Sequence, residues 1–536
     1  MAKPPARRSP EEEGEVMSTT TEQQPPRSDR LDSDRLDSDR LERPAAGDAP
    51  VAAPPKAQRR ASRSMYQKHA KVYPKAVHGP FRRIKWAALA VLLAIYYVLP
   101  WVRWDRGPNA PDQAVLLDLA NRRFYLFFVE LWPQQIYYLT GALILAALGL
   151  FLATSLAGRV WCGYACPQTV WTDLYVWVER LVEGDRGERI RLDQGPWTAR
   201  KAGRKVLKNL IWLLIALATG GAWIFYFTDA PTLLGEMLCF EVSSTALGFI
   251  GLFTATTYLL AGFAREQVCT YMCPWPRFQS AMIDEDSLIV TYQDWRGEGR
   301  SLMRKSQSWE ERRAEGLGDC IDCFNCVQVC PAGIDIRDGL QMQCIGCGLC
   351  IDACDEIMTK VGRPAGLIKF DTQTSQVAIA TGGQPVPFRL LRPRTILYTL
   401  MMLVIAGGIG VGLLLKPGLD ISVLRDRAPL FVALSDGSVR NAYTFKISNM
   451  TRDPRAYTLA VSGVAGASLS VAGDGQDEQA GTQRLTADPD MVATYRIFVT
   501  APRTGLQGAS QPLTFRLTSA DGEVATYDSV FMGPAN

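Results

Sequence analysis

The stretch that decides the fold reads Cys320-Ile-Asp-Cys323-Phe-Asn-Cys326-Val-Gln-Val-Cys330-Pro331, and a second run follows it as Cys344-Ile-Gly-Cys347-Gly-Leu-Cys350-Ile-Asp-Ala-Cys354. Each run has the C-x2-C-x2-C-x3-C spacing of bacterial ferredoxins with two [4Fe–4S] clusters, in which the fourth cysteine of a run ligates the other cluster. The spacing therefore predicts two clusters, one held by Cys320, Cys323, Cys326 and Cys354 and the other by Cys344, Cys347, Cys350 and Cys330. Paired C-x2-C motifs also bind structural zinc, but eight cysteines in this doubled pattern favour iron–sulfur clusters. We expect an electron-transferring, ferredoxin-like domain over about residues 312–360.

Five apolar segments surround this domain, and each is long enough for a membrane-spanning helix of about 20 residues. They are Ile84–Trp104, Ile136–Ala157, Val206–Phe227, Ser243–Phe263 and Thr395–Leu415. Lys and Arg gather before the first segment, between the second and third, and before the fifth, whereas the loop between the third and fourth has none. The positive-inside rule then predicts a cytoplasmic N-terminus and ferredoxin-like domain, and a C-terminus on the outer side.

The other segments complete the organisation of the chain. Residues 1–63 carry a charged five-residue repeat and no aromatic residue, so burial cannot offset chain entropy. Near the C-terminus, apolar and polar residues alternate as in a β-sandwich, over Tyr443–Ile447, Ala456–Val461, Thr494–Val499 and Leu513–Leu517. The predicted order begins with a disordered tail over 1–63 and a membrane region over 64–264, which contains four spans (84–104, 136–157, 206–227, 243–263). A cytoplasmic region over 265–393 follows. The chain then has a fifth span over 394–416 and an outer immunoglobulin-like domain over 417–536. The fold class is therefore multidomain: an α-helical transmembrane region, an inserted ferredoxin-like domain and a C-terminal all-β domain.

The composition argues against several classes of protein. A net charge of +4 in 536 residues is too small to indicate nucleic-acid binding. The two histidines, His69 and His78, precede the first apolar segment, which disfavours haem held by histidines inside the spans. The 13 cysteines are clustered, which indicates metal ligands in a reducing compartment. The start of the sequence also lacks a signal-peptide pattern.

A second cysteine motif occurs twice, as Trp161-Cys162-Gly-Tyr164-Ala-Cys166-Pro167 after the second apolar segment and as Val268-Cys269-Thr-Tyr271-Met-Cys273-Pro274 after the fourth. An i, i+4 spacing puts two sulfurs on one side of a helical turn. Soft thiolates suit Cu(I), zinc or an iron–sulfur cluster, so the four cysteines could form one shared site. The alternative is that they are buried small hydrophobes, which is the common fate of a single cysteine. The duplication favours a site, and we take Cys162, Cys166, Cys269 and Cys273 as candidate catalytic and copper-binding residues.

Four further expectations concern the surroundings of these motifs. Cys239 is expected only to pack, and Met272 could add a thioether ligand to copper. Trp171, Tyr175 and Trp177 are expected to anchor the chain at the membrane interface. The charged residues Glu179, Arg180 and Glu183 are expected to form a solvated face.

Taken together, these motifs resemble the cytochrome oxidase accessory protein family known as CcoG, FixG or RdxA. The resemblance rests on the two C-x3-C-P motifs, on the ferredoxin runs, and on Gln168–Trp171, Glu179-Arg180, Pro331–Leu340 and Cys350–Met358, and it covers about residues 70–536. It implies a multi-pass protein of the bacterial inner membrane that reduces Cu(II) to Cu(I) during assembly of a cbb3-type oxidase. The implied partners are oxidase subunits and copper-delivery proteins.

We therefore expect a cytoplasmic or quinol donor, not identified by the sequence, to reduce the clusters, and Cu(II) to be reduced at the four motif cysteines. Two alternatives remain open at this point. The chain could be a quinol-linked electron-transfer subunit that leaves Cu(II) untouched. It could also be a non-enzymatic assembly scaffold whose clusters only stabilise the fold.

Overall fold

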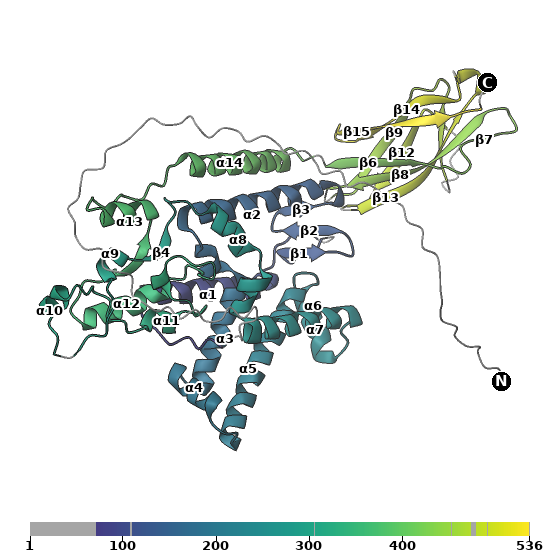
Figure 1. Ribbon diagram of the computed structural model, residues 1–536. Helices are drawn as coiled ribbons and strands as arrows, with labels where there is room; N and C mark the ends of the chain where they lie inside the picture. The colour runs from purple at the N-terminus through teal and green to yellow at the C-terminus, as the bar shows by residue number, and fades with distance from the viewer. Residues whose placement is uncertain are drawn as a thin grey trace, which may run out of the picture. The chain divides into compact units, whose positions relative to one another are not determined.

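A computed structural model of the chain describes residues 71–107, 110–304, 306–416, 418–451, 453–472, 479–489, 491–506 and 508–534 (Figure 1). The tail predicted over 1–63 lies outside these residues.

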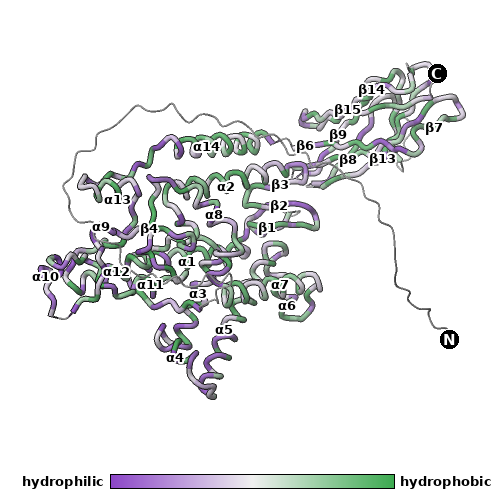
Figure 2. The backbone as a smooth tube through the Cα atoms, in the orientation of Figure 1, coloured by the Kyte–Doolittle hydropathy of each residue, from purple (hydrophilic) through white to green (hydrophobic). Residues whose placement is uncertain are grey.

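Five helices in the described part of the chain are long and apolar enough to cross a membrane, as the sequence predicts. They are α1 (Pro80–Val98), α2 (Ile136–Ala157), α5 (Ala199–Ile224), α7 (Ser244–Leu259) and α14 (Pro393–Leu414). Figure 2 shows α2 and α14 to be apolar along most of their length. Helix α5 begins at Ala199 rather than at the predicted Val206, because the Thr198 hydroxyl accepts a hydrogen bond from the Lys201 N–H and caps the helix before its apolar part.

Two shorter helices, α3 (Pro167–Glu183) and α4 (Arg186–Gln194), follow the first cysteine motif. Helix α3 packs along α5, where the buried Tyr175 ring stacks on Trp212 at a centroid distance of 5.1 Å. The Trp171 Nε1–H donates to the Thr219 hydroxyl at 3.0 Å. Interface anchoring is therefore wrong for Tyr175, because that ring lies in the protein interior.

The loops between the spans contain structure that the sequence patterns did not predict. Strands β1 (Val115–Asp118), β2 (Arg123–Leu126) and β3 (Val129–Leu131) form an antiparallel sheet after α1. Strands of three or four residues are too short to show a clear alternation of apolar and polar side chains. A short helix, α6 (Ala230–Cys239), lies between α5 and α7. Cys239 ends α6 with an exposed side chain, so the expectation that it packs is wrong.

The ferredoxin-like domain has two short helices, α11 (Asn325–Val329) and α12 (Leu349–Lys360), each of which begins within a cysteine run. Strand β4 (Ile289–Tyr292) precedes the cysteine runs in sequence and β5 (Ile368–Asp371) follows them, and the two strands pair antiparallel. Its core contains the buried side chains of Val290, Ile351 and Met358 together with several cysteines. The remaining helices of this region are α8 (Trp275–Met282), α9 (Asp294–Gly297), α10 (Trp309–Ala314) and α13 (Gln373–Ala380).

The C-terminal segment forms two antiparallel sheets with a shared apolar core, which confirms the predicted all-β domain. The first sheet contains β6 (Leu419–Arg425), β7 (Val432–Ala433), β8 (Val439–Asn449), β10 (Ser468–Val471), β11 (Gln479–Ala480) and β13 (Met491–Ala501). The second contains β9 (Arg455–Ser462), β12 (Thr482–Ala487), β14 (Ser510–Ser519) and β15 (Val524–Met532). Alternate residues of β8 and β14 point inward, so Tyr443, Phe445 and Phe515 meet in the core.

Candidate metal centres

The eight ferredoxin cysteines line two adjoining cavities. The first is lined by Cys320, Cys323, Cys326 and Cys354. The second is lined by Cys330, Cys344, Cys347 and Cys350. Cys326 lies at the wall of both, so groups bound in the two cavities would be neighbours. The cavities thus divide the cysteines in the same way as the cluster assignment made from their spacing.

Backbone conformation shapes the second cavity. Gly346 and Gly348 have φ values of 66° and 72°, which only glycine adopts without strain. The Gly346 N–H donates to the Cys344 thiol, which favours its ionised form, although burial raises the pKa of this thiol overall. Hydrogen bonds of this kind to ligand sulfurs tune the potential of an iron–sulfur cluster.

A buried arginine stands beside the first cavity. Arg337 Nη1 lies 4.0 Å from Cys320 Sγ. The same guanidinium forms ion pairs of 2.6 Å with Asp322 and with Asp335, which hold it in place. The sequence reasoning did not single out Arg337, although it follows the first cysteine run at a short distance. A positive charge at this position favours the reduced state of a cluster.

These residues fit [4Fe–4S] clusters better than single metal ions. Among the described residues, no group of three or more His, Cys, Asp or Glu side chains is arranged to hold one metal ion. Thiols distributed around a cavity suit a cubane, which takes one cysteine at each iron corner. Such clusters, when bound, accept and release electrons one at a time.

The duplicated C-x3-C-P motifs are π-helical turns, which corrects the expectation of an ordinary helical turn. The turns cover Trp161–Ala165 and Val268–Met272. In each, the N–H of the second cysteine donates to the carbonyl five residues earlier, at 2.9 Å for Cys166 and 2.7 Å for Cys273. π-Helical turns occur often at functional sites. The proline that follows each motif has no N–H and ends the turn.

The structure brings the four motif cysteines into one electrostatic neighbourhood. Burial first, and then the nearby thiols of Cys166, Cys269 and Cys273, raise the pKa of Cys162 to about 12. Burial and, to a smaller extent, the thiols of Cys166 and Cys273 raise the pKa of Cys269 to about 11. Cys162 Sγ donates to Gln279 Oε1 at 3.2 Å, a partner on α8 that the sequence did not indicate. Met272, in contrast, has 65% of its side chain exposed.

The loop of the second cluster cavity lies directly on the first motif. The Tyr164 hydroxyl donates to the Cys347 carbonyl at 2.9 Å. A Cβ atom added to Gly163 would lie 2.9 Å from the Ile345 carbonyl oxygen, so only glycine permits this approach. Arg159 Nη1 donates to the carbonyls of Gln341 and Cys344 at 3.0 and 2.9 Å, and also to that of Met342. The cluster loop and the motif thiols are therefore neighbours in the structure.

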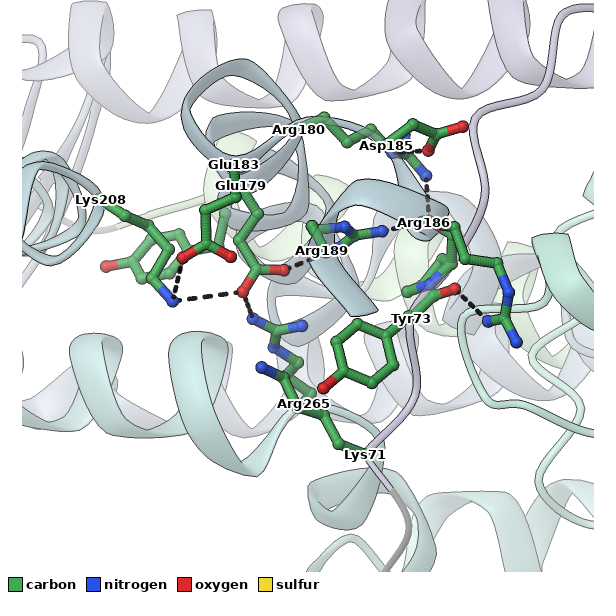
Figure 3. A network of polar contacts seen from close by, with 12 residues as sticks. Lys71, Tyr73, Glu179, Arg180, Glu183, Asp185, Arg186, Arg189, Lys208 and Arg265 are labelled. Carbon is green, nitrogen blue, oxygen red and sulfur yellow. Dashed lines mark hydrogen bonds and ion pairs between the residues drawn. The ribbon is translucent and has the colours of Figure 1, made fainter. Parts of the chain in front are cut away.

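The second motif is held by a buried charge cluster, shown in Figure 3. Arg265, which precedes the motif, pairs through Nη2 with Glu179 Oε1 at 2.7 Å. Arg189 and Lys208 also face Glu179, at 2.9 and 3.6 Å. Glu179 and Glu183 are each 1% exposed, so the predicted solvated face is wrong. These carboxylates are buried because cations from α4, from α5 and from the residue before the second motif surround them. The resulting pairs lower the pKa of Glu179 against the opposing effect of its burial.

Comparisons with known proteins identify iron–sulfur domains and a FixG-type C-terminal domain in the chain. Three family models match: "4Fe-4S dicluster domain" over residues 264–373, "4Fe-4S binding domain" over residues 139–184, and "IG-like fold at C-terminal of FixG" over residues 409–534. A solved FixG-related protein from Vibrio parahaemolyticus aligns with 22% of this chain and 95% of its own, at 26% identity and a TM-score of 0.19.

Known relatives match the chain over different shares of its length. Nitrogen fixation protein FixG of Rhizobium meliloti (strain 1021) is 49% identical, over 82% of this chain and 88% of its own. Protein RdxA of Cereibacter sphaeroides is 48% identical, over 88% of this chain and 99% of its own. Ferredoxin-type protein NapH of Escherichia coli K12 is 26% identical over 41% of this chain. With its five apolar helices and its iron–sulfur domains, the chain therefore belongs to the FixG/RdxA family of membrane iron–sulfur electron-transfer proteins.

Proposed function

We propose that this protein reduces Cu(II) to Cu(I) in the bacterial inner membrane during assembly of a cbb3-type oxidase, and that Cu(II) is reduced at Cys162, Cys166, Cys269 and Cys273. The observation that supports this proposal is the contact between the loop of Cys347 and the motif of Cys162, through the Tyr164 hydroxyl. Each Cu(II) takes up one electron, which the reduced iron–sulfur clusters of the ferredoxin-like domain supply.

The motif residues favour the product of this reaction. Thiolates prefer Cu(I) to Cu(II), so binding at the four cysteines raises the tendency of copper to accept an electron. Since Cys162 and Cys269 have raised pKa values, they are protonated at neutral pH and copper must displace their protons. The four thiols are not arranged around a single ion in this structure, so we expect copper to draw them together on binding.

The test is a comparison of two cysteine variants of the full-length protein. Anaerobic protein, reduced with dithionite and freed of the excess, is mixed with Cu(II) and a Cu(I)-specific dye. We expect Cys162→Ala with Cys166→Ala to abolish dye formation while the cluster absorbance persists. The exposed Cys239 provides the control, because Cys239→Ala removes a thiol that lies outside both motifs. Equal dye formation in the double variant and the control would reject the site.

A second occupant of the four thiols follows from one comparison. The "4Fe-4S binding domain" model covers residues 139–184 and so includes Cys162 and Cys166. A third cubane at the motif cysteines would give about twelve iron atoms per chain, whereas the copper site leaves about eight, four for each cubane. Iron and sulfide analysis of the anaerobic protein distinguishes the two occupants.

The partners and sidedness of the proposal are also open to direct tests. We propose that oxidase subunits and copper-delivery proteins contact the chain, and that the ferredoxin-like domain faces the cytoplasm because Lys and Arg flank the spans on that side. Labelling intact cells with a membrane-impermeant thiol reagent should modify the exposed Cys239, which lies in the predicted outer loop. Labelling only after the cells are opened would mean that the orientation is opposite to the predicted one.

A further inference from the structure

A cavity of about 360 Å³ lies among the apolar helices α1, α5 and α7 and the start of α3. This volume falls within the range of small-ligand sites in proteins. Three of these helices, α1, α5 and α7, are candidate membrane spans. A ligand of this cavity would therefore enter from the lipid rather than from water.

The walls of the cavity are largely aromatic. Tyr96, Trp171, Trp223 and Phe253 all line it. The Tyr96 ring lies parallel to Trp223 at a centroid distance of 6.4 Å and edge-on to Trp171 at 5.2 Å. Trp223 and Phe253 contact each other at 5.8 Å. Fixed rings of this kind give a planar ligand large faces to stack on at little entropic cost.

Polar residues are few: three threonines (Thr219, Thr256 and Thr257) and one glutamine line the cavity. The Thr219 hydroxyl accepts a hydrogen bond from Trp171 Nε1–H, and the Thr256 hydroxyl donates to the Leu252 carbonyl at 3.0 Å. Gln168 lines it next to Pro167. An apolar cavity with a few fixed hydrogen-bonding groups is typical of sites for flat, sparingly polar molecules.

Gln168 also connects this cavity to the metal centres. Its amide donates to the carbonyls of Leu260 and Arg265, at 2.9 and 3.2 Å, and so connects α3 to the segment that precedes the second motif. The same residue lines a smaller cavity, which is also lined by Cys269 and by Ile345 of the second cluster loop. A molecule in the aromatic cavity would therefore be separated from the thiols and from that cluster loop by one layer of side chains.

We infer that the aromatic cavity binds the ring of a lipid-borne quinol and that this quinol is the electron donor for copper reduction. The direction of electron flow, from quinol to copper, rests on the proposed function. Oxidation of one quinol to the quinone releases two electrons and two protons. The eight ferredoxin cysteines would hold two [4Fe–4S] clusters that take up one electron each, and the two protons would pass to water. Two Cu(II) ions then balance one quinol. The arginine beside Cys320 and Arg159 beside Cys344 favour cluster reduction, which suits a donor of moderate reducing strength.

The test uses two phenylalanine variants of the full-length protein in lipid nanodiscs. Thr256→Phe places a ring in the cavity, whereas Ala255→Phe adds the same ring to an exposed neighbour on α7 that does not line it. The first readout is calorimetric binding of decylubiquinone to the oxidised protein. The second is the rate at which decylubiquinol bleaches the cluster absorbance under anaerobic conditions, with dithionite as the reference for intact clusters.

We expect saturable binding and quinol-driven bleaching by the wild type and by Ala255→Phe. Thr256→Phe should weaken both by about tenfold or more, since small changes in the fit of an apolar pocket have effects of this order. Absence of saturable binding, or equal behaviour of the two variants, would overturn the inference and leave the cavity to membrane lipid. If quinol neither binds nor bleaches the clusters but dithionite-reduced protein still reduces Cu(II), the quinol site is rejected and the copper function is retained. If quinol binds and bleaches but Cu(II) is untouched, the copper function falls and the quinol site stands.

Discussion

Replacing Glu179 by glutamine removes the negative charge at the centre of the buried cluster in Figure 3. Three cations face this carboxylate: Arg265 at 2.7 Å, Arg189 at 2.9 Å and Lys208 at 3.6 Å. None of the three side chains is more than 9% exposed, so water cannot replace the lost partner. Removal of one partner from a buried ion pair costs about 3–5 kcal/mol. Glutamine keeps one acceptor oxygen, and we therefore expect a loss near the lower end, about 3 kcal/mol in the free energy of unfolding.

Denaturant unfolding of the detergent-solubilised protein at pH 7, followed by tryptophan fluorescence, measures this loss. Glu188→Gln is the matched control because Glu188 is exposed on the neighbouring α4, and a surface change of this kind is worth about 0.5 kcal/mol or less. Equal stability of Glu179→Gln and the control would refute the reasoning and would mean that the buried charges are solvated in the protein.

The sign of the pH dependence gives a second check on the same pair of variants. The pKa of Glu179 is lowered in the folded protein, so its contribution to stability is present above the ordinary carboxyl pKa and is lost as pH falls through the folded value. The stability difference between wild type and Glu179→Gln should be complete at pH 7 and shrink only in acid, below about pH 4.3. A difference that grows on acidification would contradict the assignment of the charge.

Three further predictions concern the metal centres. Gly163→Val should place a side chain against the Ile345 carbonyl, weaken the docking of the cluster loop by about 1–3 kcal/mol and slow dye-detected copper reduction, whereas electron paramagnetic resonance of the clusters stays unchanged. Arg337→Met should lower the reduction potential of the cluster at Cys320, as measured in a redox titration. The effect should be smaller than the roughly 4 kcal/mol of an uncompensated unit charge at this distance, because two aspartates already offset the charge of the arginine. The affinity for Cu(I), measured in competition with a Cu(I) probe, should rise between pH 6.5 and 8.5. The reason is that copper must displace the proton of Cys162, whose pKa is raised to about 12. An affinity that does not change with pH would show that the Cys162 thiol is not a ligand.

Spacing and hydropathy predicted those features that depend on residues close together in sequence. The doubled C-x2-C-x2-C-x3-C runs indicated iron–sulfur clusters because three thiols on one loop match three corners of a cubane. Length and apolar composition predicted the five spans, and the alternation in Tyr443–Ile447 predicted a strand that lies within β8. The short strands β1 to β3 were missed because they are too brief for a periodic signal.

The sequence by itself determined the ligand types, the number of spans and the all-β C-terminal domain, since each follows from local chemistry or a local period. Only the tertiary structure decided that Glu179 and Glu183 are buried, because their countercharges come from separate elements: Arg189 on α4, Lys208 on α5 and Arg265 before the second motif. It also decided that the Cys347 loop rests on Tyr164, and that rings from α1, α3, α5 and α7 enclose one cavity. Burial and charge compensation depend on which segments meet, and no local pattern contains that information.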